Sequence, residues 1–224
     1  MQGFTYEVDI ALVIDVTGSM HGILDEVKAN ALRFHEDLTA AMRAKDKTID
    51  SLRVRVVAFR DYYADGEQSM ETSEFFELPA QQGEYSAFVS ALVPTGGGDE
   101  PESGLEGLVL GMRSDWAKSG SKRRQVIIVW TDASAHPLEK NAGSKPVVYP
   151  KGMPADFDAL TDLWEGQDYM DMNAKRLIIY APDAYAWTDM GLHWENTVHY
   201  TSKAGRGLSD VDYSTIIDTI AASV

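Results

Sequence analysis

The sequence predicts an α/β fold in which a mostly parallel, doubly wound sheet carries helices on both faces. Apolar runs rich in β-branched residues alternate along the chain with segments of helical periodicity. No linker, internal repeat or low-complexity segment interrupts this alternation, so we predict a single domain over residues 1–224. The composition, 44% hydrophobic and 25% charged, is that of a globular protein able to bury a core.

The first half of the chain predicts two strands, a long helix and a short edge strand. A strand at Tyr6–Ile14 precedes a helix whose apolar residues recur three or four positions apart. A second strand at Leu52–Phe59 is followed by the short run Glu74–Leu78. No helix fits between these two runs, so we expect them to pair antiparallel, with the short strand at an edge. The apolar helix positions are Ile23, Val27, Ala31, Phe34, Leu38 and Met42.

The second half continues the alternation. The run Gln125–Trp130 is typical of a strand buried on both faces of a parallel sheet. A long loop at Ala133–Ala155 follows it, and loops of this length are usually functional or mobile. The other predicted elements are helices at 84–93, Ser103–Trp116, Asp156–Met172 and Asp210–Ala222, and strands at Arg176–Tyr180 and Thr197–Tyr200.

The charge balance excludes some partners and favours others. Lys and Arg total 20 against 35 Asp and Glu, which gives a formal charge of −15. Such a surface repels nucleic acid and anionic membranes and favours cations or basic partners, although much of the charge also serves solubility. The chain has no cysteine, which excludes disulfides and thiol chemistry. We expect a cytoplasmic protein, because no targeting segment or membrane span is recognisable; a domain of a secreted chain would share these features.

Aspartates follow four of the predicted strands within three residues: Asp15, Asp61, Asp132 and Asp183. The carboxyl ends of parallel strands share one edge, so these residues and the loop that carries Asp99 would lie near one another. Carboxylates brought together raise each other's pKa unless a cation lies among them. The pattern therefore predicts a metal site at this edge of the sheet.

The turn Asp15-Val16-Thr17-Gly18-Ser19-Met20 has the donors for such a site. One carboxylate and two hydroxyls at alternate positions suit a hard divalent cation such as Mg²⁺, with Mn²⁺ or Ca²⁺ as alternatives. A plain turn with Ser19 as helix N-cap is the competing interpretation, and Asp99 has the same alternative as a cap of the helix after it.

These motifs resemble those of the von Willebrand factor A domains. The signature of that family, the metal-ion-dependent adhesion site (MIDAS), is Asp-x-Ser-x-Ser after the first strand, a threonine in a second loop and an aspartate after the fourth strand. Asp15, Thr17 and Ser19 match the first element, with threonine replacing the first serine, and Thr131-Asp132 matches the last. The resemblance covers essentially the whole chain.

The second loop, Pro94-Thr95-Gly96-Gly97-Gly98-Asp99-Glu100-Pro101-Glu102, departs from that signature. Alignment by its glycines puts Asp99 where the family has its threonine, with Thr95 as the alternative for that role. The loop looks like the branch that contains hemicentin-type and α-kinase-linked domains. A third carboxylate would add negative charge to the metal site. It would thereby weaken the electrostatic attraction between the ion and an acidic residue of a partner.

The resemblance implies a Rossmann-like, six-stranded sheet of order 3-2-1-4-5-6 with an antiparallel edge strand. It also implies a Mg²⁺ site formed by Asp15, Thr17, Ser19, Asp99 and Asp132. In the family, the open position of the ion takes an acidic residue of a partner protein. The implied function is a metal-dependent protein-interaction module, not an enzyme, and the oligomeric state stays open.

Other residues near the predicted edge have simpler interpretations. We expect Asp61 to pair with Arg60, with support of the site as the alternative, and Glu102 to lie in the first turn of a helix. His136 is expected to be an exposed loop residue.

A metal-assisted phosphoester hydrolase is the alternative function, because carboxylates around Mg²⁺ can also activate water. Haloacid-dehalogenase phosphatases use Asp-x-Asp, however, where this chain has Asp15-Val16-Thr17. The sequence also lacks a Gly-x-Ser-x-Gly nucleophile elbow and a nucleotide-binding P-loop.

Overall fold

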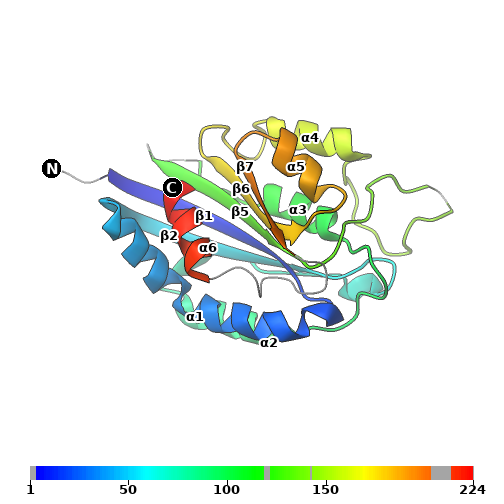
Figure 1. Ribbon diagram of the computed structural model, residues 1–224, viewed down its shortest axis with the longest axis horizontal. Coiled ribbons are helices and arrows are strands. Elements are labelled where there is room, and N and C mark those ends of the chain that lie inside the picture. The colour runs from blue at the N-terminus through cyan, green and yellow to red at the C-terminus, as the bar shows by residue number, and fades with distance from the viewer. Residues whose placement is uncertain (1–3, 119–121, 142, 203–212, 224) are drawn as a thin grey trace.

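The computed structural model describes residues 4–118, 122–141, 143–202 and 213–223 (Figure 1). Its centre is one mixed sheet of seven strands in the order β3-β2-β1-β5-β6-β7, with β4 also paired to β2. Strands β1, β2, β5, β6 and β7 are parallel, whereas β3 and β4 run antiparallel to β2. The predicted doubly wound α/β fold is therefore confirmed. The expected edge strand at Glu74–Leu78 corresponds to β4, and β3 is an additional short strand, so the sheet has seven strands and not the expected six.

The bounds of the elements follow the chain. The strands are β1 (Phe4–Asp15), β2 (Lys47–Phe59), β3 (Met70–Thr72), β4 (Phe76–Leu78), β5 (Arg123–Trp130), β6 (Lys175–Pro182) and β7 (Thr197–Ser202). The helices are α1 (His21–Ala44), α2 (Gln82–Ala91), α3 (Gly104–Met112), α4 (Phe157–Glu165), α5 (Trp187–His193) and α6 (Tyr213–Ser223), with short 3₁₀ turns η1 (Gly18–Met20) and η2 (Gly66–Gln68).

Helices cover both faces of the sheet, as Figure 1 shows, with α1, α2 and α6 on one side and α3, α4 and α5 on the other. Successive side chains of β1 point to opposite faces of the sheet, so this strand contributes to the hydrophobic cores on both faces. Ile10, Leu12 and Ile14 join the core under α1, α2 and α6, whereas Ala11 and Val13 join the core under α3, α4 and α5. The central strands are thus buried on both faces, as their nearly continuous apolar sequence predicts.

The predicted helices agree with the structure except at the end of α3, which lies at Met112 and not at Trp116, and near α4 and α5. Helix α4 ends at Glu165, before Gly166, and not at Met172; α5 has no counterpart among the predicted elements. On α1, Phe34, Leu38 and Met42 are buried as expected. The side chains of Ile23, Val27 and Ala31, and the predicted start of the last helix at 210–212, lie outside the described residues.

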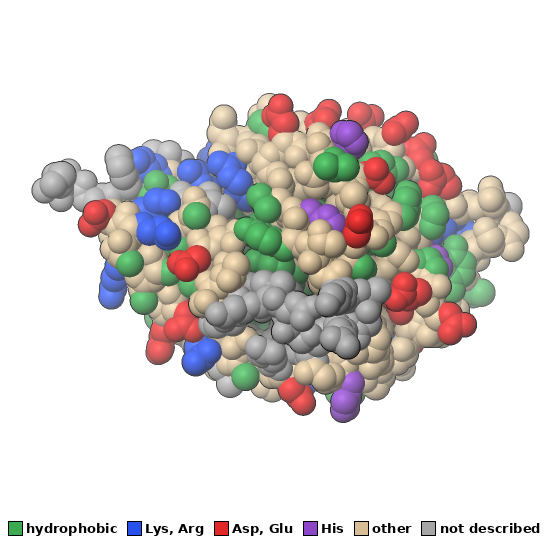
Figure 2. Space-filling view, in the orientation of Figure 1, with side chains coloured by type: hydrophobic (Ala, Val, Ile, Leu, Met, Phe, Trp, Pro, Cys, Tyr) green, Lys and Arg blue, Asp and Glu red, His purple; other side chains and the backbone are tan. Residues whose placement is uncertain are grey.

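Charge is unevenly distributed between the two ends of the sheet. Lys47, Arg123, Arg124 and Arg176 lie at the amino ends of their strands, and Figure 2 shows Lys and Arg side chains gathered at that end of the visible face. Lys47, Lys122 and Arg124 each place a cation 5.5–5.9 Å from the ring of Tyr6. In the part of the chain that the structure describes, no helix is long and apolar enough to cross a membrane.

The strand register brings the predicted site residues to one level. Asp15 pairs with Phe59 of β2, and Ile14 pairs with Trp130 of β5. The residues after Trp130, Thr131 and Asp132, therefore leave the sheet directly beside Asp15. In the strand order, β1 and β5 are neighbours, and successive strands are added on opposite sides of this pair. Folds of this kind bind ligands at the carboxyl ends of such a pair of strands.

Candidate metal centre

Asp15 is the buried centre of the site, with no exposed surface. Its Oδ1 accepts hydrogen bonds from the backbone N–H of Thr17 at 2.9 Å and from the Thr17 hydroxyl at 2.6 Å. Its Oδ2 accepts a hydrogen bond from the hydroxyl of Thr131 at 2.6 Å. Residues from β1, from the turn after it and from the end of β5 thus meet at one carboxylate.

Two hydroxyls connect the two predicted carboxylates of the site. Ser19 Oγ donates to Asp132 Oδ1 at 2.9 Å and lies 3.1 Å from Thr17 Oγ1. The structure therefore brings Asp15, Thr17, Ser19 and Asp132 together, although Asp15 and Asp132 are far apart in sequence. Asp132 is 1% exposed, and its Oδ2 has no hydrogen-bond partner among the described residues.

Helix capping does not use these hydroxyls. Thr17 is the N-cap of η1 and Met20 the N-cap of α1, and neither makes a side-chain capping bond. The hydroxyls of Thr17 and Ser19 instead face the carboxylates of Asp15 and Asp132. This arrangement contradicts the competing interpretation of Ser19 as an ordinary N-cap.

The environment of both carboxylates disfavours their charged forms. Burial raises the pKa of Asp15 to about 6; the nearby Asp132 adds to the rise, and hydrogen bonds from Thr131 and Thr17 limit it. Burial also raises the pKa of Asp132, against the hydrogen bond from Ser19. A cation among these oxygens would favour their ionised forms instead.

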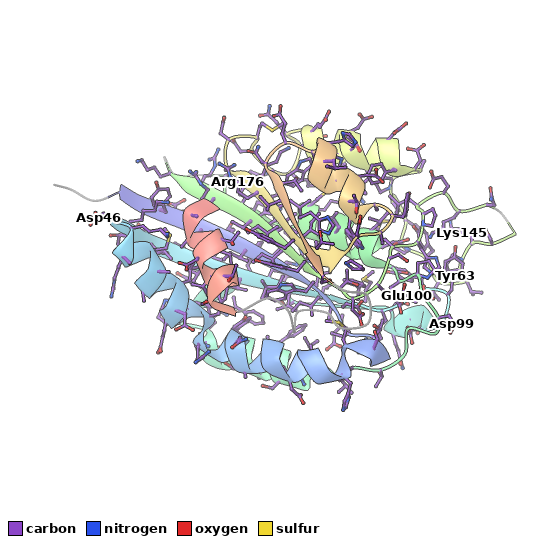
Figure 3. All side chains as sticks on the ribbon, viewed as in Figure 1. Asp46, Tyr63, Asp99, Glu100, Lys145 and Arg176 are labelled. Carbon is purple, nitrogen blue, oxygen red and sulfur yellow. The ribbon has the colours of Figure 1, made fainter. Side chains whose placement is uncertain are left out.

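The glycine loop carries two predicted metal ligands, Asp99 and its alternative Thr95. No described side-chain contact joins either of them to the four residues of the site. Asp99 is exposed, and Figure 3 places it at the outer end of the molecule, near Glu100. Asp99 does not cap the next helix either, because the N-cap of α3 is Ser103. Thr95 is also exposed, and its backbone N–H donates to the carbonyl of Val16. The role of Asp99 as a ligand remains a prediction.

The acidic side chain that the loop does bury is Glu102, which is 5% exposed. It precedes the N-cap of α3, so its expected place in the first helical turn is wrong; Glu106 occupies that turn. Burial raises the pKa of Glu102 to about 9, and the charges of Asp15, Asp61, Asp65 and Asp132 contribute to the rise. Its Oε2 has no hydrogen-bond partner among the described residues.

The loop after β2 holds the glycine loop in place. Asp65 Oδ2 accepts hydrogen bonds from Gly97 N–H at 2.9 Å and from Asp61 N–H at 3.1 Å. Arg60 donates to the carbonyls of Val93, Gln68 and Thr95. The predicted pairing of Arg60 with Asp61 is therefore wrong, because backbone carbonyls occupy the guanidinium.

Asp61 instead lies against His136, whose Nε2 is 3.2 Å from Asp61 Oδ1. His136 is also in ring contact with Tyr63, so the expected exposed histidine is mostly covered. Burial opposes the ionisation of Asp61, but His136, the Tyr63 N–H and the Ser103 hydroxyl outweigh it and hold its pKa below the ordinary value. The sequence contained no spacing signal for this contact.

A short parallel bridge joins the glycine loop to the segment after β5. The N–H of Glu102 donates to the carbonyl of Ser134 at 2.9 Å, and the N–H of His136 donates to the carbonyl of Glu102 at 2.8 Å. Asp183, the fourth predicted strand-end acid, is not part of this group. Its exposed carboxylate accepts a hydrogen bond from Thr188 in α5 at 2.6 Å.

The side-chain donors of the four residues at this site are of the kind that a hard divalent cation prefers. Every polar side-chain atom of Asp15, Thr17, Ser19 and Asp132 is an oxygen, and a carboxylate oxygen of Asp132 is unpartnered. Within residues 4–118, 122–141, 143–202 and 213–223, no three Asp, Glu or His side chains converge as a ready metal-binding group. A site here therefore depends on hydroxyl donors beside its carboxylates.

A family model described as von Willebrand factor A domain matches residues 9–143, more than half of the chain. The chain belongs to the von Willebrand factor A domain family. This domain is 27% identical over 158 residues to alpha-protein kinase vwkA of Dictyostelium discoideum. The alignment covers 70% of the domain and 23% of the kinase, so the activity of the whole kinase is not transferred.

Solved structures show the same fold at low sequence identity. The pilus adhesin SpaC of Lactobacillus rhamnosus GG aligns over 96% of the domain and 30% of its own chain, with a TM-score of 0.59 and 11% identity. The minor pilin PilB of Streptococcus sanguinis aligns over 96% of the domain and 61% of its own chain, with a TM-score of 0.55 and 12% identity. At such identities, the similarity concerns the fold alone.

Proposed function

We propose that this von Willebrand factor A domain is a protein-interaction module that binds its partner through a divalent cation, with Mg²⁺ as the first candidate. The observation that carries the proposal is the pair of hydroxyls, Thr17 and Ser19, that connect the buried carboxylates of Asp15 and Asp132. The similarity to vwkA supports a place in the kinase-linked branch of the family.

Asp15, Thr17, Ser19 and Asp132 would hold the ion, and Thr131 would fix the orientation of Asp15. When bound, the cation supplies a positive centre that can accept an oxygen of a partner's acidic residue. The net charge of −15 gives the cation a second effect. An acidic partner is repelled by this surface unless positive charge is present at the contact, so binding would depend on the metal.

We also propose that the domain is not an enzyme. Hydrolysis would need a general base beside the metal-bound water. The histidine that the structure brings to this edge, His136, is engaged with Asp61 and Tyr63. His136 is therefore not available as a histidine base, and membership of the von Willebrand factor A domain family supports a binding role over the alternative of a phosphoester hydrolase.

The first test is the thermal stability of the purified domain in chelator and in excess Mg²⁺. A ligand at about 100 times its Kd stabilises the folded state by about 2.7 kcal/mol. For a domain of this size, that raises Tm by roughly 5–10 °C. We expect this rise for the wild type and its loss in Asp15→Ala. An unchanged wild-type Tm in Mg²⁺ or Mn²⁺ would contradict the proposal.

The second test separates binding from catalysis. Proteins captured on the domain in Mg²⁺ and released by chelator should no longer bind Asp132→Ala. Substitution of one acidic residue in the captured partner should have the same effect. Turnover of phosphoesters by the wild type that is lost in Asp132→Ala would establish the hydrolase instead.

A further inference from the structure

The loop between β5 and α4 carries positive charge in an otherwise acidic chain. Residues 140–155 contain three lysines, Lys140, Lys145 and Lys151, and no Asp or Glu, whereas the whole chain has a net charge of −15. Figure 1 shows this loop extending away from the sheet, and Figure 3 places Lys145 on it, at the same end of the molecule as Asp99. The loop therefore forms a basic surface whose charge is opposite to that of the molecule as a whole.

The same loop surrounds an open pocket of about 400 Å³. Lys145, Lys151 and Tyr149 line the pocket, and Met153 with two prolines supplies an apolar wall. Both of these lysines are exposed, and neither forms an ion pair with a carboxylate among the described residues. The pocket thus combines two ammonium groups with apolar surface.

Contacts with the body of the domain fix one wall of the pocket. Tyr149 donates its hydroxyl to Glu106 Oε1 at 2.8 Å, and Lys140 Nζ lies 3.3 Å from the same oxygen. The Nζ atoms of Lys140 and Lys145 each lie 5.5 Å from the centre of the Tyr149 ring. These contacts orient the ring before any ligand binds, which lowers the ordering cost of binding.

The outer part of the loop offers further groups to a ligand. Val147 is fully exposed, and Val148 is 37% exposed. Within the part of the chain that the structure describes, the backbone of residues 145–151 makes no hydrogen bond to another backbone group. Exposed apolar side chains beside available backbone donors and acceptors suit an extended peptide, which can contact both.

We infer that this pocket is a second docking site, which binds a short acidic segment of a partner protein without a metal ion. Carboxylates of the segment pair with Lys145 and Lys151, and an apolar side chain of the segment packs against Met153 and the prolines. The inference is independent of the proposed function, because Asp15, Thr17, Ser19 and Asp132 do not line the pocket.

The charge of the whole molecule distinguishes between classes of acidic ligand. Exposed charges are screened from one another beyond about 8–10 Å at physiological ionic strength, so a short segment responds mainly to the lysines that it touches. A nucleic acid or an anionic membrane presents charge over a larger area and would also meet the acidic surface of the domain. A short acidic peptide is therefore the ligand that this pocket fits.

The experiment measures the fluorescence anisotropy of a fluorescein-labelled peptide of alternating glutamate and leucine, titrated with the intact domain in chelator at low salt. We expect the wild type to bind this peptide and the double variant Lys145→Gln/Lys151→Gln to bind it about tenfold more weakly. A peptide with glutamine in place of glutamate carries the same label and should not bind.

The matched control is the double variant Lys45→Gln/Lys118→Gln, which should bind the peptide as the wild type does. It removes the same charge from exposed lysines that precede β2 and β5, at the opposite end of the sheet. Both double variants should keep the Tm of the wild type, because all four side chains are exposed.

Several outcomes would overturn the inference. Equal weakening in the two double variants would show that net charge alone drives binding, and no binding by the wild type at millimolar concentration would show that the pocket does not accept such a segment. Tighter binding of phosphatidylserine vesicles or duplex DNA than of the peptide would assign the pocket to another class of ligand. Asp15→Asn should bind the peptide as the wild type does, so a failure of the metal proposal leaves this result unchanged; a loss in Asp15→Asn alone would place the segment at the cation site instead.

Discussion

Asp61 shows how single contacts set the charge of the groups around the site. Its carboxylate accepts hydrogen bonds from the N–H of Tyr63 and the hydroxyl of Ser103, both at 3.2 Å, and faces His136 at the same distance. Each contact favours the ionised form, so the pKa of Asp61 lies below its ordinary value of 3.8 despite burial. Ionised Asp61 therefore stabilises the folded state.

This lowered pKa predicts how Asp61→Asn responds to pH. A group whose pKa is lowered by folding contributes stability above its unfolded pKa and loses it as pH falls through the folded pKa. We expect the variant to be about 1–3 kcal/mol less stable than the wild type at about pH 7. The difference should persist at about pH 5 and shrink only below the ordinary value of 3.8.

Urea denaturation in chelator across this pH range provides the measurement. Asp99→Asn is the matched control, because Asp99 is exposed and should show no such difference. A gap between Asp61→Asn and the wild type that already closes between about pH 7 and pH 5 would mean that the pKa of Asp61 is not lowered.

At the scale of residues, sequence reasoning identified Asp15, Thr17, Ser19 and Asp132 as a group, and the structure brings them together. These residues follow parallel strands, so the topology alone predicts their proximity. Glu102 was instead expected in the first turn of a helix. Its buried position depends on the backbone of Gly97, where a Cβ would clash with Glu102 Oε1. A left-handed φ at one glycine is set by contacts from another loop, here the carboxylate of Asp65, and leaves no periodic signal in the sequence.

At the scale of elements, the loop between β5 and α4 is attached to the body by a buried ion pair. Lys140 Nζ lies 3.3 Å from Glu106 Oε1, with 6% and 0% of their side chains exposed. Tyr149, further along the same loop, donates its hydroxyl to the same Glu106 oxygen at 2.8 Å. One carboxylate of α3 therefore holds two separate points of this loop.

Removal of the cation from this pair should be costly, because it leaves Glu106 buried and uncompensated. We expect Lys140→Met to lower the free energy of unfolding by about 3 kcal/mol. Lys145→Met is the matched control, because exposed Lys145 contacts only the ring face of Tyr149 among the interactions described. Its effect should stay within about 0.5 kcal/mol.

Urea denaturation of both variants measures this difference. Limited proteolysis between residues 139 and 154 adds a local readout, since the loop of Lys140→Met should be cut faster. Equal stabilities of Lys140→Met and Lys145→Met would show that the pair with Glu106 does not hold the loop.

Strong periodicity and β-branched runs were sufficient to predict most elements. The missed helix α5 has seven residues and begins after Ala186, whose φ is +71°. Trp187 and Met190 bury one face of it, a signal too short to separate from loop sequence. The edge strands β3 and β4 have three residues each, because each pairs with a different part of β2. Such lengths follow from tertiary pairing and not from local propensity.

At the scale of the whole molecule, the net charge of −15 is not spread evenly. Basic side chains gather at the amino ends of the strands (Figure 2), and acidic side chains such as Asp65, Asp99 and Glu102 lie in the loops at the carboxyl ends. Among the described residues at this end, Lys140 pairs with Glu106 and Arg60 donates to backbone carbonyls, so these two cations are already engaged. Repulsion within this end therefore opposes the compact state.

Salt should relieve this repulsion. In chelator, an increase of NaCl from about 0.02 M to about 0.5 M should raise the free energy of unfolding by roughly 1 kcal/mol, or Tm by about 2–4 °C. Differential scanning fluorimetry measures the shift. The same series in saturating Mg²⁺ should give a smaller rise, because the bound cation already offsets part of the charge. A Tm that falls with salt would show that attractive ion pairs outweigh the repulsion.

The bridge between Glu102 and the segment Ser134–His136 has a mechanical consequence. Two backbone hydrogen bonds join these segments. If one segment is displaced, the other is therefore expected to move with it. A force on the loop after β5 would pull on Glu102 and, through Gly97, on the hydrogen bond to Asp65. Tension applied at the rim of the domain would thus be delivered to Glu102 without passing through the sheet.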